Sequence, residues 1–249
     1  MSEILHRPGA LAARLRALTP ARVALGRTGV SLRTADLLDF QRAHAQARDA
    51  VLAPLGVSSL AASLAAITGE EVLVLHSAAT DRTTYLQRPD LGRRLSQTSR
   101  ACLPAGDWDL AIIVADGLSA IAVERHAPPL IQQLLPLLEG WRLAPLAIVE
   151  QGRVAIGDEI GAALGAQISV VLIGERPGLS SPDSMGIYIT WKPRLGRVDA
   201  ERNCISNIRI GGLDYSTAAV QLNRYMTEAR LRQLTGIALK EGSRLLNEG

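Results

Sequence analysis

Short apolar runs recur along residues 71–191, and segments with helical periodicity separate them. Each run is four to nine residues long, the length of a strand, and several end in Gly, Asp or Glu. Apolar strands that alternate with helices are typical of a parallel sheet covered on both faces. The pattern therefore predicts an α/β fold with a Rossmann-like, doubly wound, mostly parallel sheet. The predicted strands are residues 71–79, 110–115, 146–149, 168–173 and 187–191, and the predicted helices are 120–139, 158–164 and 216–234.

The first third of the chain has helical rather than strand patterning. Apolar positions recur every three or four residues over 34–51, where Thr34 is the predicted N-cap. An alanine-rich helix over 58–67 should follow and end at Gly69. We therefore expect an N-terminal helical arm over residues 1–69, for docking a partner, and a Rossmann-like domain over 70–249.

Composition narrows the function classes. The 249 residues carry a net charge of +3, which is too small to indicate a nucleic-acid-binding protein. Cys102 and Cys204 are the only cysteines, so a disulfide framework is not expected, and no cluster has metal-ligand spacing. We expect a reducing, intracellular compartment. The first twenty residues do not resemble a secretory signal, and no apolar run reaches the ~18 residues of a membrane span.

Candidate site residues follow the predicted strands. Ligands of such sheets bind beyond the carboxyl ends of the strands, so the loops after four strands should form one rim. The candidates in these loops are Asp116, then Glu150, Arg153 and Val154, then Glu175 and Arg176, and last Arg194, Arg197, Asn203 and Cys204.

The usual catalytic signatures are missing from the sequence. "GRVAIG" at 152–157 is neither G-x-G-x-x-G nor a P-loop, and the acidic Asp158 and Glu159 follow where a phosphate would need bare amides. There is no G-x-S-x-G elbow, and the four histidines are scattered. His44 fits a structural or interface role. A chain without a complete catalytic constellation is expected to complete a site on a partner.

Five long segments carry a family resemblance. They read "RTGVSLRTADLLDFQRAHAQARDAV", "YLQRPDLGRRL", "VADGLSA", "GERPGLSSPDSMG" and "ERNCISNI", in chain order. Together they resemble the small subunit of ethanolamine ammonia-lyase over nearly the whole chain. The resemblance implies a lyase subunit that works only with a large, substrate-holding TIM-barrel subunit, in a hetero-oligomer that converts ethanolamine to acetaldehyde and ammonia.

The same resemblance implies adenosylcobalamin as the cofactor. The small subunit would cap the lower, dimethylbenzimidazole-bearing part of the cobalamin and would hold no catalytic residue and no metal ligand of its own. The sequence lacks the D-x-H-x-x-G motif of cobalamin domains that bind cobalt through histidine, as the resemblance implies. The matched motifs give Val154, Glu175 and Cys204 as cofactor-binding residues.

Alternatives remain at each of these positions. Cys204 could be a buried structural thiol, Glu175 could form an ion pair with Arg176 or Arg153, and Val154 could only pack in the core. In the arm, Arg27, Arg33 and Arg42 are expected to meet acidic groups of the large subunit, or else to form a solvated face.

Two other function classes stay open, namely a stand-alone Rossmann-like nucleotide-binding enzyme and a purely structural interaction subunit. We expect no nucleic-acid or membrane partner. A cytoplasmic location is expected, and the sequence leaves open whether it is within a bacterial microcompartment.

Overall fold

The computed structural model describes residues 10–19 and 21–239, and is built on one six-stranded sheet. The strands lie in the order β3, β5, β4, β6, β7, β8. The first four of these are parallel, whereas β7 and β8 are antiparallel to their neighbours. Their bounds are Leu73–His76 (β3), Trp108–Ala115 (β4), Ala147–Glu150 (β5), Ala166–Gly174 (β6), Met185–Trp191 (β7) and Asn203–Ile208 (β8). The prediction of an α/β fold with a mostly parallel sheet is confirmed.

The direction of β7 differs from the predicted parallel arrangement. Only residues 175–184 connect β6 to β7, and they contain two prolines and no helix. A parallel connection needs a crossover of a dozen or more residues, usually with a helix, so this link can only return the chain beside β6 in the opposite direction. The loop after β7 therefore starts at the opposite end of the sheet from the loops after β3 to β6.

Helices cover both faces of the sheet. On one face, α3 (Val57–Thr68), α6 (Ala120–Leu134) and α8 (Tyr215–Arg232) pack against apolar side chains such as Ile112 and Leu172. On the other, α7 (Ile156–Leu164) packs against Ile113 and Val171. The four predicted helices among these are confirmed within a few residues, and Gly69 ends α3 in the left-handed conformation, with φ of 74°. The short helices α4 (Arg82–Gln87) and α5 (Gln97–Ala101) are additional, as are 3₁₀ turns at Leu91–Arg93, Leu135–Leu137 and Asp199–Glu201.

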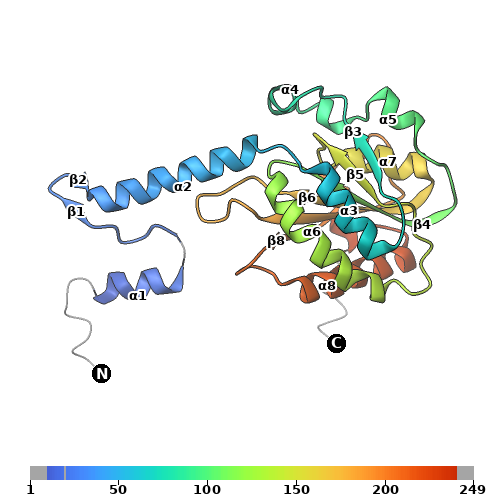
Figure 1. Cartoon of the computed structure of the whole chain (residues 1–249). Helices are drawn as coiled ribbons and strands as arrows, with labels where there is room; N and C mark the ends of the chain where they lie inside the picture. The colour runs from blue at the N-terminus through green and yellow to red at the C-terminus, as the bar shows by residue number, and fades with distance from the viewer. Residues whose placement is uncertain (1–9, 20, 240–249) are drawn as a thin grey trace, which may run out of the picture.

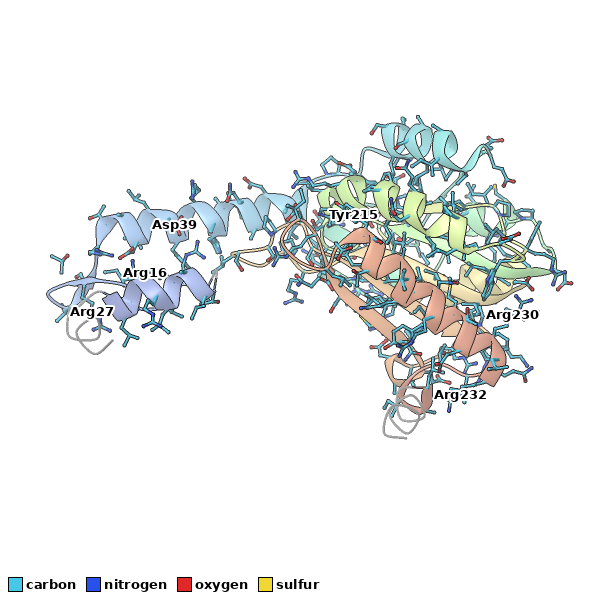
Figure 2. The ribbon with its side chains drawn as sticks, turned by 90° about the horizontal axis from the view of Figure 1, so that it is seen from below. Arg16, Arg27, Asp39, Tyr215, Arg230 and Arg232 are labelled. Atoms are coloured by element: carbon cyan, nitrogen blue, oxygen red, sulfur yellow. The ribbon has the colours of Figure 1, made fainter. Side chains whose placement is uncertain are left out.

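The N-terminal segment projects away from the sheet (Figure 1). It comprises α1 (Ala10–Leu18), a small hairpin of β1 (Arg27–Thr28) and β2 (Ser31–Leu32), and α2 (Thr34–Leu52). Figure 2 labels Arg16 on α1 and Asp39 on α2. Arg22 links the connecting segment to α2 through an ion pair with Asp39 of 2.9 Å.

Helix α2 begins one residue earlier than predicted from its cap. Arg33, not Thr34, is the N-cap, with extended φ and ψ of −66° and 143° and no side-chain cap bond, and Thr34 is the first helical residue. Of the nineteen residues of α2, only Ala43 and Ala50 are buried. The other predicted helix of this region, α3, packs Leu60 and Leu64 into the core.

No single helix within residues 10–19 and 21–239 is long and apolar enough to cross a membrane; α2 and α3 pass the test only as a pair bent by 77°. Residues 1–9, which include His6, and Lys240 lie outside the described residues.

Candidate functional site

One face of the sheet is covered only in part. Helix α7 lies over β4 and β6, whereas no helix of the described chain packs closely on the same face of β7 and β8. Side chains alternate between the two faces of a strand, so Gly186, Tyr188 and Thr190 of β7 point to this face. Cys204 pairs with Tyr188 across the two strands and shares that face. Gly186, Tyr188 and Cys204 form the floor of what we call the open face, whereas Thr190 is buried beneath Arg202.

Cys204 lies in a strand, not in the predicted loop before the last helix. It belongs to β8, opposite Tyr188, and its side chain is half-buried. Burial raises the pKa of Tyr188 to about 12, and the hydrogen bond with Cys204 and the charge of Glu175 add to the shift. Because Cys204 is only half-buried, its thiol lies at the surface of the open face, where a ligand could contact it.

Glu175 lies at the same face, directly after β6. Its Oε2 accepts a hydrogen bond from the Ser184 hydroxyl and another from the backbone N–H of Asn207 at 3.4 Å. Its other oxygen, Oε1, lies close to Gly186 on the open face. The ion pairs of the described residues do not include Glu175, so its interpretation as a partner of Arg176 or Arg153 is wrong.

Val154 borders a hollow of about 350 Å³ next to Tyr188. It is half-buried and packs against the core on this face. The same side chain therefore both packs against the core and lines the hollow. The other lining residues are Pro89, Arg93, Arg153, Ala155, Tyr188, Arg197, Val198 and Asp199. The three predicted site residues are thus brought to one face, grouped around Tyr188.

The loop 192–202 departs from the predicted rim because β7 runs the other way. It starts at the far end of the sheet and folds back, so that Arg197 reaches the hollow while Arg194 is not among its lining residues. A buried ion pair fixes this return: Arg202 contacts Asp158 at 2.6 and 2.7 Å and donates to Thr190 at 3.0 Å.

Two further predicted rim residues are buried supports. Asn203 exchanges hydrogen bonds with the backbone of Gly236, at 2.7 and 3.1 Å. Asp116 is 2% exposed and accepts a hydrogen bond from the Gly152 amide at 3.0 Å. It also forms an ion pair of 3.2 Å with Arg82, and burial raises its pKa to about 6. Asp116 therefore ties the loop after β4 to the loop that carries Val154.

Arg82 and Tyr85 were not anticipated from the sequence. The Arg82 guanidinium donates to the Val51 carbonyl at the end of α2 at 2.8 Å and to the Gly117 carbonyl at 2.9 Å. The buried Tyr85 hydroxyl donates to the Gly152 carbonyl at 3.1 Å. The two residues connect the base of the N-terminal segment to the edge of the open face. Their polarity was visible in the sequence, but nothing in its pattern indicated a short helix there.

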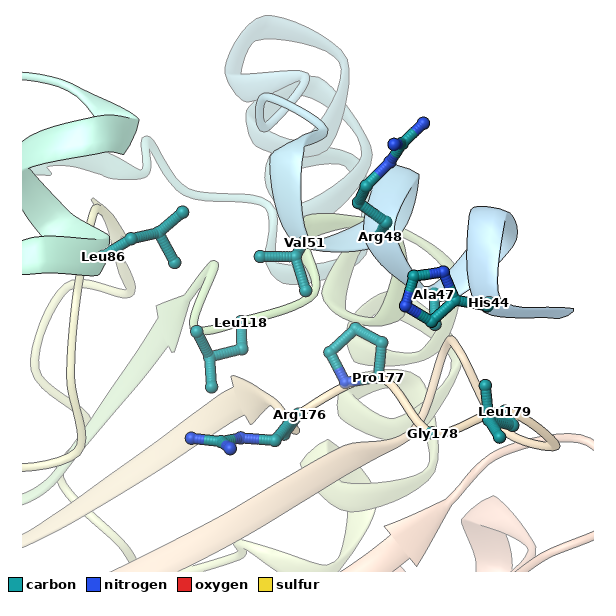
Figure 3. A pocket seen from close by; sticks show the side chains of 10 residues that line it. All are labelled: His44, Ala47, Arg48, Val51, Leu86, Leu118, Arg176, Pro177, Gly178 and Leu179. Atoms are coloured by element: carbon teal, nitrogen blue, oxygen red, sulfur yellow. The ribbon is translucent and has the colours of Figure 1, made fainter. Parts of the chain in front are cut away.

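A second hollow, of about 450 Å³, lies where α2 meets the sheet domain (Figure 3). Its floor is apolar, and His44, Arg48 and Arg176 place basic groups around it. The lining residues are His44, Ala47, Arg48, Val51, Leu86, Leu118, Arg176, Pro177, Gly178 and Leu179. Both hollows border the loop network that Arg82 and Asp116 hold together.

Comparisons with known proteins agree over almost the entire chain. Residues 10–240 match the family model described as "Ethanolamine ammonia-lyase light chain (EutC)". A protein of Pseudomonas fluorescens (strain Pf-5) named "Ethanolamine ammonia-lyase small subunit" is 57% identical over 91% of this chain and 85% of its own length. Proteins with the same name from Pseudomonas paraeruginosa and Ralstonia nicotianae are 58% and 56% identical, over 91% and 92% of this chain and 86% and 87% of their own lengths.

Proposed function

The chain belongs to the family of ethanolamine ammonia-lyase light chains, and from this we infer that it is the small subunit of an adenosylcobalamin-dependent ethanolamine ammonia-lyase. In this proposal it completes the cobalamin site at the interface with the large subunit, which holds ethanolamine. The sheet domain is a Rossmann-like cobalamin cap, and the N-terminal segment is a docking arm. The enzyme is expected in the cytoplasm, free or within a microcompartment.

The observation that carries the proposal is the grouping of Val154, Glu175 and Cys204 around Tyr188 on a sheet face that the described helices leave open. An extended, partly apolar cofactor needs a broad surface with few, well-placed polar groups. The open face offers apolar area from Val154 and the Tyr188 ring, and an acceptor from Glu175. Corrin side chains end in amides, which can donate to such an acceptor.

Each residue has a binding role in this proposal. Glu175 accepts a hydrogen bond from a corrin amide while Ser184 holds its second oxygen. Val154 and Cys204 contact the cofactor and exclude water beside Tyr188. When bound, the cofactor supplies the radical chemistry that removes ammonia from ethanolamine, and this chain orients it.

The docking arm is supported by its exposed apolar side chains. A helix exposed on almost all sides is marginally stable alone, so α2 is expected to gain its stability from a partner. The exposed large apolar residues of the arm are Leu11, Leu15, Leu18, Val30, Leu32, Leu37, Leu38, Phe40 and Leu52. Arg33 pairs with Asp36 at 3.0 Å, whereas Arg42 shares Asp39 with Arg22, so that this second cluster keeps one net positive charge.

Further basic groups that could meet the partner lie around the second hollow. Arg48 is 3.8 Å from Asp49, and Arg176 forms no ion pair with a residue that the structure describes. We propose that an acidic segment of the large subunit docks there, next to the base of α2.

Reconstitution tests the function. The purified chain alone should not deaminate ethanolamine with adenosylcobalamin, and adding the cognate large subunit should produce turnover. Gel filtration should leave red cobalamin with the complex, and a nucleotide should not co-elute. Turnover by the small chain alone, or retention of a nucleotide in place of cobalamin, would favour a stand-alone enzyme. Complex formation without cobalamin binding would favour a structural subunit.

A further inference from the structure

The hollow beside Val154 is rich in arginine. Arg93, Arg153 and Arg197 line it, and Asp199 is the one carboxylate among its lining residues in the described chain. The Asp199 side chain is 93% exposed and lies 3.5 Å from Arg202, outside the cluster. The lining therefore has an excess of positive charge in a concave site, which favours an anion.

The three arginines differ in the ion-pair and hydrogen-bond partners that they already have. Arg197 pairs with Glu201 and donates to the carbonyls of Trp191 and Lys192, at 2.9 and 3.2 Å from its Nη2 and Nε. Its role is to hold the loop 192–202 in place. Arg93 is exposed and has no ion pair with any residue in 10–19 or 21–239.

Arg153 is positioned but only partly satisfied. Its guanidinium stacks 4.2 Å from the centre of the Tyr85 ring, and Nη2 donates to the Tyr85 carbonyl at 3.2 Å. Its Nε is buried and has no hydrogen-bond partner among the described residues. Stacking fixes the planar guanidinium without neutralising its charge.

A close backbone approach brings Arg93 next to Arg153. The Arg153 amide donates to the Gly92 carbonyl at 2.7 Å. A Cβ at Gly92 would lie 2.9 Å from Arg153 Cγ and 2.9 Å from the Tyr85 ring, so only glycine permits this contact. The 3₁₀ turn that carries Arg93 is therefore held against the loop that carries Arg153 and Val154.

We propose that Arg93 and Arg153 form an anion subsite for the phosphodiester in the nucleotide loop of cobalamin. The inference rests on the proposed function, which places the cofactor at Val154, next to both arginines. The phosphodiester is the anionic group of this cofactor, and paired guanidinium groups suit its oxygens in charge and in geometry. The apolar walls from Pro89, Val154 and Val198 reduce the competition from water.

The test compares two corrinoids on the reconstituted complex and needs no turnover. Adenosylcobalamin carries the phosphodiester, whereas adenosylcobinamide lacks both it and the nucleotide. Equilibrium affinities are measured by ultrafiltration and absorbance for the wild type, Arg93→Gln, Arg153→Gln and the control Arg88→Gln. Arg88 is exposed, pairs with Asp90 and does not line the hollow.

We expect Arg93→Gln and Arg153→Gln each to weaken adenosylcobalamin binding about tenfold or more, because a charge-assisted hydrogen bond is lost. Adenosylcobinamide affinity should stay within about twofold of the wild type, and Arg88→Gln should change neither. Equal weakening of both corrinoids, or no change in either, would overturn the subsite.

Two further results separate the possible failures. If Arg153→Gln destabilises the chain through its contact with Tyr85, the exposed Arg93→Gln decides alone. If the wild-type complex binds neither corrinoid, the proposed function fails, and the subsite fails with it. If it binds both with equal affinity, only the subsite fails.

Discussion

Replacing Glu175 by Gln changes one oxygen of a carboxylate whose surroundings are well defined. Oε2 is held by the Ser184 hydroxyl and the backbone N–H of Asn207, both of which donate hydrogen bonds. In Glu175→Gln the amide oxygen should keep these donors, because the NH₂ group could not accept from them. The NH₂ group then replaces Oε1, the oxygen on the side of Gly186 and the open face.

The substitution therefore turns an acceptor at the open face into a donor and removes its charge. A corrin amide that donates to Oε1 would lose a charge-assisted hydrogen bond, which contributes about 1.5–3 kcal/mol. The expected loss of cobalamin affinity is about tenfold to a hundredfold. Saturated turnover should fall less, since Glu175 has no part in the chemistry.

The assay is a titration of adenosylcobalamin against the reconstituted complex, followed by initial rates and by absorbance. Glu228→Gln is the matched control, because Glu228 lies on α8, on the other face of the sheet, and makes the same change of charge. Ser184→Ala removes one of the two hydrogen bonds to Oε2 and should weaken cobalamin binding by about 1 kcal/mol. Unchanged affinity in Glu175→Gln, or the same loss in Glu228→Gln, would refute this placement of the carboxylate.

Three other predictions concern the thiol, the docking surface and the buried acid. Cys204→Ala should weaken cobalamin binding by only ~1 kcal/mol, about fivefold in a titration, because a thiol is a weak donor; an effect larger than that of Glu175→Gln would contradict its role. The double change Arg48→Glu and Arg176→Glu should weaken binding to the large subunit by about 2 kcal/mol or more at low salt, measured by co-purification. Binding equal to that of the wild type would exclude the second hollow as a docking surface. Since burial raises the pKa of Asp116 from 3.8 to about 6, the folded chain keeps a proton there that the unfolded chain has lost, and the stability that Asp116 contributes falls as pH rises through this window. Urea unfolding gives the free energy of unfolding at about pH 4.5 and at about pH 7. The decrease between these two pH values should be roughly 2 kcal/mol smaller in Asp116→Asn than in the wild type. An equal decrease in both proteins would show that Asp116 is not protonated in the folded chain at the lower pH.

The parts of the fold that the sequence predicts are those buried on both faces. Strands β4 and β6 are continuous apolar runs because helices cover them from both sides. The sequence "NCISNI" of β8 was missed because Ser206 and Asn207 are exposed and only Ile205 and Ile208 enter the core. A strand with one solvated face at the end of a sheet carries a weak hydrophobic signal, and a register shift near Ile187 weakens its alternation further.

The direction of β7 could have been predicted. The link 175–184 holds Pro177, Gly178 and Pro182 and is too short for a crossover helix, which is evidence for an antiparallel return. The buried ion pairs that support the site could not have been predicted from the sequence. Arg82 and Asp116 lie 34 positions apart, and Asp158 and Arg202 lie 44 apart, so only the folded topology brings each pair together.

The central claim is that cobalamin lies on the open face against Cys204, and thiol footprinting tests it most directly. The reconstituted complex is treated with an alkylating reagent with and without adenosylcobalamin, and modification of each cysteine is followed by mass spectrometry. Cys102 is exposed and lies outside the proposed site, so it serves as the internal control. The account predicts that cobalamin slows alkylation of Cys204 and leaves that of Cys102 unchanged. Equal rates at Cys204 with and without the cofactor would contradict it.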